Sequence, residues 1–565
     1  MSEEGGGGAH APASRRSRQR PTSHNLSLSV LTHAHTHASL LPFAGDLGNL
    51  DALDPAAAAK LPALMALKAS LYSPAFRSFI RTVTGCGPLA PTTDCSANVY
   101  ARGGHLLTHD DVIGSRRVSW ILYLTDPDEE WDVATEGGGL ELFPLAVPGA
   151  AGTPSPRPAT VLPPSWNSLA LFTVQPGISF HAVQEVTAEA KPRLSISGWF
   201  HAPAGEGAGA APSASLAQLQ LRRGEDCLAG HVPFPVTEAT GGDLSGADRA
   251  FLAAWVNPAY LKPAAWAAVR ARFEADGSVQ LHRFLRPDLA ARVAALITAA
   301  DASDKLGGWR LPAGAGVGEG HGGWAVVGPP HKQRYLAFTG KAAAPSALGV
   351  VGEAESADPS APAPILPADP AAAAGAALAS IQAHLLTSLP FARLLKACTT
   401  VTMLAVSPDG PRRFRPGLDY TVAHYGAITA SPRLDAVLCF VDEAGEGDSE
   451  TSPWAAGDVG GFEAYLLADE EEDGSKGASA SAAAAAVYRA ADADAGVINA
   501  PAAANCLNLT LRDDGLMRFV KYVSAGAPGS RWDVAVEYLP EDDGEEEEEE
   551  EGEEVEKEEE EKAGA

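Results

Sequence analysis

Two stretches of the chain, RVSWILY at residues 117–123 and RLDAVLC at residues 433–439, share one pattern that decides the fold. Each begins with an arginine and then places apolar side chains at alternate positions, which is typical of a β-strand with one buried face. Three further pairs of segments match in the same order along the chain. Trp131 and residues 138–143 match Trp454 and residues 460–465, residues 167–169 match residues 505–507, and residues 193–194 match residues 531–532. Four ordered matches predict that the chain contains two copies of one β-fold.

Short β-type runs bounded by glycine, proline and aspartate surround the first of these stretches. They cover residues 118–124, 139–145, 168–174 and 194–200, and β-type texture returns from residue 400 to residue 538. Strands of this length at such close spacing predict a sandwich or jelly roll. Residues 146–164, rich in alanine, proline and glycine, are predicted to be a loop insertion.

Helical patterns occur outside the β-type runs and complete the predicted organisation. Apolar spacing predicts helices in 56–84, broken at Pro74, and in 251–273 and 284–300. Residues 341–377 are low in complexity and are predicted to be a surface insertion, and the alanine- and serine-rich stretch 474–487 is predicted to interrupt the second β-region. We therefore expect five parts: a disordered segment 1–40, a first β-domain 41–202, a linker 203–240, a second β-domain 241–540 with low-complexity insertions, and an acidic tail 541–565.

The formal net charge of -29 is concentrated at one end of the 565-residue chain. Residues 541–565 contain 17 acidic residues and two lysines, so we expect this tail to be disordered. The tail is either a solubilising appendage or an attraction for a basic partner. Because the remainder is only mildly acidic, nucleic-acid binding is not expected. The six scattered cysteines favour a reducing compartment, and no apolar run approaches membrane-spanning length.

The strongest chemical pattern is His109-Asp110-Asp111, which follows two leucines. In a strand, residues two apart point to the same side, so His109 and Asp111 would present an imidazole and a carboxylate to one centre. His181 follows the predicted strand 168–174 and is the expected third ligand. Two imidazoles and one carboxylate form the facial triad of non-haem iron(II) sites, which leaves positions open for a bidentate oxo-acid and dioxygen.

Arg193 begins the next predicted strand and is the expected partner of a carboxylate ligand. A guanidinium can bind a carboxylate through two parallel hydrogen bonds, which a lysine cannot do. Each of these residues alone commonly has a structural role: an HxD sequence in a loop or cap, a histidine in a hydrogen-bonded core, an arginine in a surface ion pair. Their order on an all-β pattern favours the joint interpretation.

The internal repeat supplies a comparison within the same chain. His424 corresponds to His109, but Gly426 stands where Asp111 stands, and residues 519–522 contain no histidine to match His181. Cys439 replaces Tyr123, whereas Arg531 matches Arg193. Because the second copy keeps its strand pattern without the predicted ligands, these ligands are not required by the fold. The prediction is one metal site, in the first copy only.

The quoted residues resemble the Tpa1/Ofd1 prolyl hydroxylase family over roughly residues 60 to 540. The resemblance is carried by His109-Asp110-Asp111, Ile121-Leu122-Tyr123-Leu124, Trp166-Asn167, Phe180-His181, the run 193–201 (RLSISGWFH), Trp255-Val256-Asn257-Pro258 and Gly328-Pro329-Pro330. It implies a mainly β protein with flanking helices (α+β), built from two tandem double-stranded β-helix (jelly-roll) domains of which the first is catalytic and the second degenerate. It also implies that Tyr100 and Tyr123 would bind 2-oxoglutarate beside Arg193.

The resemblance further implies prolyl 3-hydroxylation, with 3,4-dihydroxylation in fungal and algal members. The implied cofactors and co-substrates are Fe(II), 2-oxoglutarate, O2 and L-ascorbate. The implied substrate is a small-subunit ribosomal protein at the decoding centre, with translation-termination factors as further partners and cytoplasm or nucleus as the compartment. Two alternatives stay open: the same chemistry on another substrate, and a non-catalytic docking module in translation or transcription.

Overall fold

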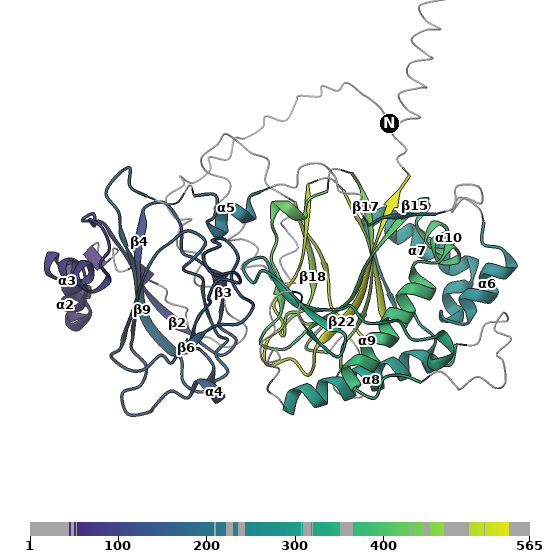
Figure 1. Ribbon diagram of the computed structural model, residues 1–565, viewed down its shortest axis with the longest axis horizontal. Coiled ribbons are helices and arrows are strands. Elements are labelled where there is room, and N and C mark those ends of the chain that lie inside the picture. Colours follow the sequence, from purple (N-terminus) through teal and green to yellow (C-terminus); the bar gives the residue numbers. More distant parts are fainter. Residues whose placement is uncertain are drawn as a thin grey trace, which may run out of the picture.

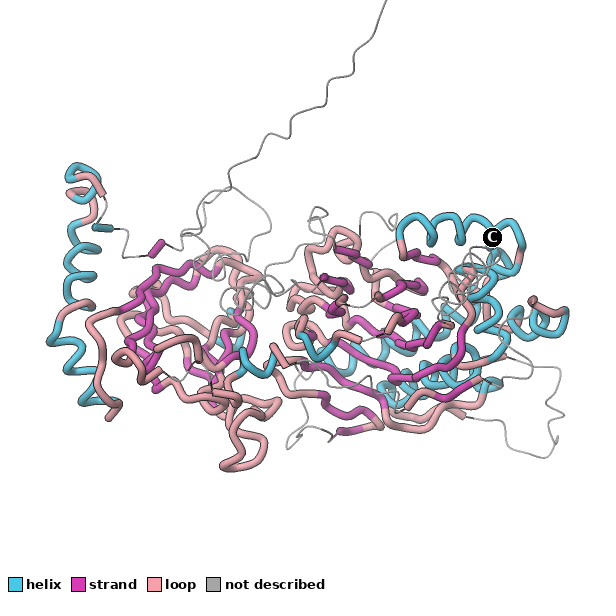
Figure 2. Tube along the Cα trace, turned by 90° about the horizontal axis from the view of Figure 1, so that it is seen from above, coloured by secondary structure: helices cyan, strands magenta, loops and turns pink. Residues whose placement is uncertain are grey.

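The computed structural model describes residues 45–46, 50–51, 53–207, 209, 211–221, 230–234, 243–306, 308, 318, 320–350, 365–429, 431–443, 452–467, 497–513 and 515–541. Over these residues the protein is mainly β-sheet with helices outside, arranged as two β-units (Figure 1). We call strands β1–β9 with helices α1–α4 the N-terminal unit, and strands β10–β22 with helices α6–α10 the C-terminal unit. Seen from above, most helices lie at the two outer ends, with the strands between them (Figure 2).

The N-terminal unit contains two antiparallel sheets. One has the order β1-β2-β9-β4-β7 and the other the order β3-β8-β5-β6. Its strands are β1 Gly45–Asp46, β2 Thr93–Tyr100, β3 Leu106–His109, β4 Arg116–Tyr123, β5 Leu140–Leu142, β6 Thr160–Leu162, β7 Leu169–Thr173, β8 His181–Val183 and β9 Arg193–His201. The four predicted strands thus correspond to β4, β5, β7 and β9.

Helices cover only one face of the five-stranded sheet. They are α1 Pro55–Ala58, α2 Pro62–Leu71 and α3 Pro74–Thr84, while α4 Val133–Glu136 lies in a loop. The predicted break at Pro74 is the start of α3, where Ser73 caps the helix and proline occupies its first turn. Ile80 of α3 packs in one cluster with Trp120 and Phe200, which project to this side of the sheet. The alternate strand residues therefore face the second sheet.

The C-terminal unit is built around a larger sheet and a three-stranded sheet. The larger sheet has the order β11-β20-β17-β22-β15-β14-β13-β12, with β10 paired to β15 and β16 to β14, and the smaller has the order β19-β18-β21. The strands are β10 Val232–Pro233, β11 Ser278–His282, β12 Gly320–His321, β13 Trp324–Val327, β14 Gln333–Phe338, β15 Met403–Phe414, β16 Tyr420–Thr421, β17 Arg433–Phe440, β18 Glu463–Leu467, β19 Val497–Ala500, β20 Cys506–Arg512, β21 Leu516–Val520 and β22 Arg531–Pro540.

Helices of the C-terminal unit enclose the largest hydrophobic core together with the larger sheet. They are α6 Gly246–Ala253, α7 Pro263–Asp276, α8 Pro287–Leu306, α9 Pro370–Ile381 with its π-helical continuation Gln382–Leu386, and α10 Leu389–Thr399. Within the described residues no single helix is both long and apolar enough to cross a membrane; only the bent pair Pro370–Leu386 and Leu389–Thr399 meets those criteria when taken together.

The strands of the two units have equivalent neighbours. The order β2-β9-β4-β7 recurs as β15-β22-β17-β20, and β8-β5-β6 recurs as β21-β18-β19. The register agrees as well, because Leu122 pairs with both Ile196 and Leu169, just as Leu438 pairs with both Val534 and Leu507. The segments matched by comparing the chain with itself therefore lie on equivalent strands.

Three predictions of irregular structure were wrong in part. The expected loop insertion 146–164 contains β6, which pairs with β5, and the expected linker 203–240 contains α5 Ser215–Leu219 and β10. The expected surface insertion 341–377 ends in the buried helix α9, because its alanines are good helix formers small enough to pack closely in the core.

The predicted helix 251–273 is interrupted at Pro258 and Pro263, and the one expected from residue 284 begins at Pro287. Residues 1–40, 474–487 and 542–565 lie outside the described residues.

Substitution of Gly375 in α9 tests how tightly this helix is packed. A Cβ at this position would lie 2.2 Å from the Phe338 ring, whose centroid is itself 5.2 Å from that of Trp324. We expect Gly375→Ala to lower the free energy of unfolding by about 1–3 kcal/mol through overpacking, despite the roughly 1 kcal/mol helix preference of alanine. Urea unfolding followed by tryptophan fluorescence would measure the change.

Gly246→Ala is the matched control, because Gly246 begins α6 and a Cβ there would have no heavy atom within 4 Å. This variant should leave stability unchanged or raise it by up to about 1 kcal/mol. Equal effects of the two substitutions would show that α9 is not tightly packed against Phe338.

Candidate metal centre

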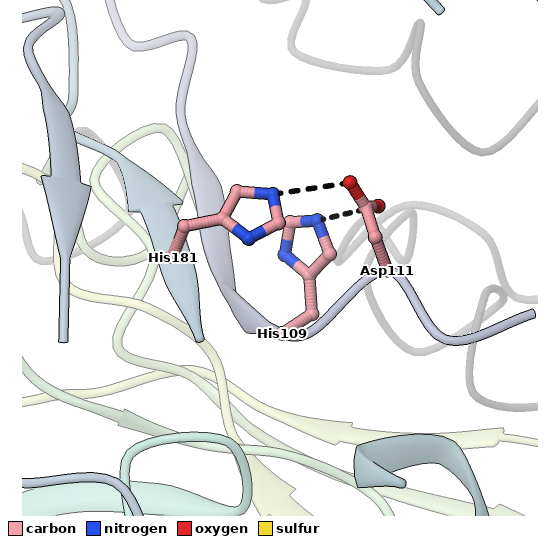
Figure 3. Close-up of side chains that lie close together, drawn as sticks. All are labelled: His109, Asp111 and His181. Carbon is pink, nitrogen blue, oxygen red and sulfur yellow. Dashed lines mark ion pairs between the residues drawn. The ribbon is translucent and has the colours of Figure 1, made fainter. Parts of the chain in front are cut away.

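His109, Asp111 and His181 lie together between the two sheets of the N-terminal unit. His109 ends β3 and His181 begins β8, and these two residues are paired across the strands. The Nε2 atoms of His109 and His181 lie 3.3 and 3.4 Å from the two carboxylate oxygens of Asp111 (Figure 3). All three potential ligand atoms lie within 4.8 Å of one another, close enough to share one ion.

Asp111 reaches this position by a turn rather than by strand alternation. β3 ends at His109, and Asp111 has a left-handed backbone with φ of 62°. Aspartate tolerates this conformation better than most residues other than glycine. The predicted proximity of His109 and Asp111 is therefore found, but the strand argument for it was wrong.

Both imidazoles are held in the same manner by the backbone. His109 Nδ1 lies 2.7 Å from the carbonyl oxygen of Leu107, and His181 Nδ1 lies 2.9 Å from that of Ser179. Such bonds fix the ring orientation and place the proton on Nδ1, which leaves the Nε2 lone pair available. Both Nε2 atoms face Asp111, as a shared metal ion requires.

The Asp111 carboxylate is buried and surrounded by positive or donating groups. Ser119 Oγ donates a hydrogen bond of 2.8 Å to it, and Arg116 Nη1 lies 3.7 Å away. Burial alone would raise the pKa of Asp111, but His181 and His109 outweigh burial and hold this pKa well below its usual range. The Asp111 carboxyl is therefore ionised, as a metal ligand must be. Sequence reasoning missed Ser119, although it is the one serine in strand β4.

Asp110 is structural and anchors the metal-binding loop to other segments. Its carboxylate accepts hydrogen bonds from the backbone N–H groups of Gly177 (2.8 Å) and Ser215 (3.0 Å), and from Ser215 Oγ (2.7 Å). Ser215 begins α5, so a helix in the predicted linker is attached directly to the loop between His109 and Asp111.

Arg193 and two tyrosines form a second cluster. Arg193 begins β9, is 1% exposed, and has its guanidinium carbon 4.9 Å from the ring centre of Tyr100 and 5.0 Å from that of Tyr123. Arg193 Nη2 and Tyr123 Oη are buried, and apart from their approach to each other neither has a hydrogen-bond partner among the described residues. Burial raises the pKa of both tyrosines, so they remain hydrogen-bond donors. Unsatisfied buried donors beside a guanidinium fit a carboxylate ligand.

Two left-handed glycines allow the backbone to approach Arg193. Gly137 and Gly138 have φ of 63° and 70°, and Arg193 Nε donates a 2.7 Å hydrogen bond to the Gly138 carbonyl. A Cβ on Gly137 would lie 1.9 Å from the carbonyl oxygen of Glu185, which explains the requirement for glycine. Any other residue would displace the backbone on which Arg193 rests.

The same turn occurs in the C-terminal unit. Gly460 and Gly461 have φ of 68° and 69°, a Cβ on Gly460 would meet the Tyr522 carbonyl oxygen at 1.9 Å, and Arg531 Nη1 donates a 2.9 Å bond to the Gly461 carbonyl. The equivalent of Gly460-Gly461 is therefore Gly137-Gly138, one residue earlier than the Gly138-Gly139 matched in the sequence.

The corresponding positions around Arg531 carry different chemistry. Phe414 pairs with Arg531 as Tyr100 pairs with Arg193, and Cys439 takes the place of Tyr123. In the C-terminal unit Arg518 pairs with Tyr465 across the strands, and in the N-terminal unit His181 makes the equivalent pair with Leu142. A guanidinium therefore occupies the position of the second imidazole. Carboxylates of Asp533 and Glu463 lie 2.9 and 3.7 Å from Arg531 Nη2. The donor set for a metal ion is thus present in the N-terminal unit and absent from the equivalent described positions of the C-terminal unit.

Both parts of the chain match models of known families. Residues 95–201 match the 2OG-Fe(II) oxygenase superfamily. Residues 247–547 match the model described as oxoglutarate and iron-dependent oxygenase degradation C-term.

Curated relatives match in the same way. A prolyl 3,4-dihydroxylase, OGFOD1 of Ostreococcus tauri, is 36% identical over 509 residues, which cover 87% of this chain and 86% of the relative. The prolyl 3-hydroxylase OGFOD1 of Xenopus laevis is 34% identical over 41% of this chain and 39% of its own length. Among solved structures, a Pseudomonas putida prolyl-4-hydroxylase is 27% identical over 20% of this chain and 54% of its own, with a TM-score of 0.16.

The two family models and the near full-length relative agree with the chemistry of the site. Two imidazoles, a carboxylate and a neighbouring arginine pocket suit iron(II) and 2-oxoglutarate, the cofactor and co-substrate that the superfamily uses with O2. The chain belongs to the Ofd1-type family of 2-oxoglutarate- and iron(II)-dependent oxygenases.

Proposed function

We propose that this oxygenase hydroxylates a prolyl residue at C3, with a second hydroxylation at C4, in a small-subunit ribosomal protein at the decoding centre. The relatives named as prolyl 3-hydroxylases and a prolyl 3,4-dihydroxylase support a prolyl residue as the target. The ribosomal protein, and an effect on translation, are the finer parts of the proposal. The observation that carries it is the His-Asp-His cluster next to the buried, unpartnered donors of Arg193 and Tyr123.

In this proposal His109, Asp111 and His181 hold iron(II), and Arg193 with Tyr123 binds the far carboxylate of 2-oxoglutarate. When bound, iron(II) and 2-oxoglutarate supply the oxidative chemistry by which O2 and a prolyl C–H group give hydroxyproline, succinate and carbon dioxide. The chain's own residues position the reactants. The rings of Tyr100 and Tyr123 cover the guanidinium, and the burial of Arg193 keeps water from its ion pair with the co-substrate.

We further infer that the C-terminal unit is a degenerate copy of the double-stranded β-helix in the N-terminal unit. The equivalent strand order and the equivalent Arg531–Gly461 hydrogen bond support this. The carboxylates of Asp533 on the same strand and of Glu463 on the facing sheet lie beside Arg531 Nη2, whereas the Nη2 of Arg193 has no such carboxylate beside it among the described residues. Opposing Arg518, Arg531 and Arg412 overcome the effect of burial on Glu463 and lower the pKa of that carboxyl to about 2, so this network stays ionised.

Replacement of a metal ligand should separate catalysis from docking. His109→Ala removes one of two imidazoles, so we expect loss of iron(II) binding and of the succinate formed with prolyl substrate. Iron content after anaerobic loading and succinate release would measure these effects. His384→Ala, at an exposed histidine of the C-terminal unit, is the control and should leave both values unchanged. Full turnover by His109→Ala would refute the ligand assignment.

The Tyr123 hydroxyl is predicted to contribute to co-substrate affinity. Tyr123→Phe keeps the ring beside Arg193 but removes a donor to a carboxylate, an interaction worth about 1.5–3 kcal/mol. We expect the KM for 2-oxoglutarate to rise roughly tenfold or more with kcat little changed, since this bond is made equally in ground and transition states. Steady-state kinetics would show this. Tyr335→Phe, at a half-buried tyrosine of the C-terminal unit, should not alter KM, and an unaltered KM in Tyr123→Phe would contradict the role.

The proposed substrate can be examined in cells. Mass spectrometry of small-subunit ribosomal proteins should find a prolyl residue carrying one or two added oxygen atoms in cells with this chain. The same residue should be unmodified in cells without the chain and in cells that contain only the His109→Ala variant. Identical prolyl modification in all three would exclude a ribosomal substrate while leaving the iron and 2-oxoglutarate chemistry intact.

A further inference from the structure

A polar cavity of about 500 Å³ lies in the C-terminal unit, outside the site described above. Residues from several strands and from the chain between them line it, including Lys332, Gln333, His424, Arg512, Arg518 and Glu537. Arg518 is the residue whose strand position corresponds to His181, and His424 is the residue matched in sequence to His109. The cavity therefore lies where the C-terminal unit would hold its metal site if it had kept one.

The guanidinium groups on the wall are ordered from behind by buried carboxylates. Arg518 Nε lies 2.6 Å from Glu463, and Arg518 Nη1 lies 3.4 Å from Asp435. Arg512 pairs with Asp435 at 3.2 Å and with Glu537. Arg518 Nη2 is buried and has no hydrogen-bond partner. The guanidinium of Arg518, which lines the cavity, is thus held rigidly and keeps one buried donor without an acceptor among the described residues.

Charged side chains form a network behind the cavity wall. This network contains four guanidiniums, those of Arg412, Arg512, Arg518 and Arg531, and four carboxylates, those of Asp435, Glu463, Asp533 and Glu537. The charges of these eight groups balance. Glu537 is the carboxylate on the cavity wall, and Arg433 at 3.4 Å and His231 at 3.5 Å also approach it.

Lys332 adds a cation to this balanced network. No carboxylate lies within ion-pair distance of its ammonium group among the residues that the structure describes. Burial lowers the pKa of Lys332, the effect expected of an ammonium group that has lost water without gaining a counterion. An anion beside Lys332 and Arg518 would supply that counterion.

We propose that this cavity is a binding site for an oxyanion, held by Lys332 and Arg518 through charge-assisted hydrogen bonds. Phosphate and carboxylate groups share the required chemistry. One source is a small phosphate-bearing molecule. The other is the chain's own glutamate-rich C-terminus, because β22, which carries Glu537 on the cavity wall, ends at Pro540 immediately before the acidic residues. An ancestral cation site would then have become an anion site by exchange of an imidazole for a guanidinium.

Calorimetric titration of the full chain with pyrophosphate tests the free-anion source. The titration should be performed without metal, at constant ionic strength, and with saturating 2-oxoglutarate to occupy the Arg193 pocket. We expect saturable binding that Lys332→Gln weakens about tenfold or more, as loss of a charge-assisted bond predicts. Lys341→Gln makes the same charge change at an exposed lysine away from the cavity and should leave the affinity unchanged. Equal weakening by both variants, or by neither, would place pyrophosphate elsewhere and overturn the assignment.

Carbodiimide coupling of the full chain tests the tail source. If the tail occupies the cavity, Lys332 should become joined to a glutamate of residues 542–565, and mass spectrometry would locate the bond. Coupling at Lys332 should exceed coupling at Lys341 and should decrease when pyrophosphate is added. Pyrophosphate binding without selective coupling would identify the free anion as the ligand, and selective coupling without pyrophosphate binding would identify the tail. Absence of both would refute the anion site.

Discussion

The hydrogen bond from Arg193 to the carbonyl of Gly138 is the constraint on which the site depends. It fixes the first residue of β9 against the turn that leads into β5, and so joins the two sheets at the end where the pocket lies. Only a left-handed backbone at Gly137 and Gly138 brings that carbonyl within reach, because a Cβ at Gly137 would collide with Glu185. With the Nε of the guanidinium anchored in this way, the buried Nη2 has no partner among the described residues, and in the proposed function it would bind the carboxylate of 2-oxoglutarate. Pre-organisation of this kind lowers the entropy lost when 2-oxoglutarate binds.

The C-terminal unit shows what the same anchor does in other surroundings. Arg531 makes the equivalent bond to Gly461, yet Asp533 and Glu463 then neutralise it. Buried ion pairs are costly to desolvate, and removal of one partner leaves an uncompensated charge. If the C-terminal unit is a degenerate copy, as proposed above, the loss of a carboxylate ligand requires either internal carboxylates or the loss of the arginine. Asp533 stands at the register position of Ser195, so the arginine has a carboxylate two residues after it in the C-terminal unit and a hydroxyl there in the N-terminal unit.

The sequence was sufficient to predict the strands and their matching order in the two units, because these depend on local alternation. It also predicted that His109, Asp111 and His181 lie together, because few residue types can bind a metal ion. The roles of the six predicted site residues stay predictions. The sequence was insufficient where contacts distant in sequence decide. Asp111 was expected to follow strand alternation, whereas Asp110, held by Ser215 and Gly177, draws the chain into a left-handed turn. The alanine-rich α9 was expected at the surface because low complexity usually indicates a loop, but a sheet with a large ring at Phe338 needs small residues opposite it. The one-residue shift at Gly137-Gly138 could not be seen, since three consecutive glycines precede β5 and only their backbone angles tell them apart.

The two units meet at the residues that flank the metal ligands. Tyr420 Oη lies 3.3 Å from Thr108 Oγ1, next to His109, and the ring of His331 stacks 5.3 Å from that of Phe180, next to His181. Glu185, whose carbonyl oxygen packs against the Gly137 turn, accepts bonds of 2.6 Å from Ser524 Oγ and from the N–H of Ala525. Contacts to the first ligand, the second ligand and the arginine pocket thus all come from the C-terminal unit. Since ligand geometry must be held within fractions of an ångström for efficient catalysis, the packing of the C-terminal unit against these neighbours affects the active site. If the C-terminal unit is a degenerate copy, as proposed above, this packing is a physical reason for it to persist as a folded partner.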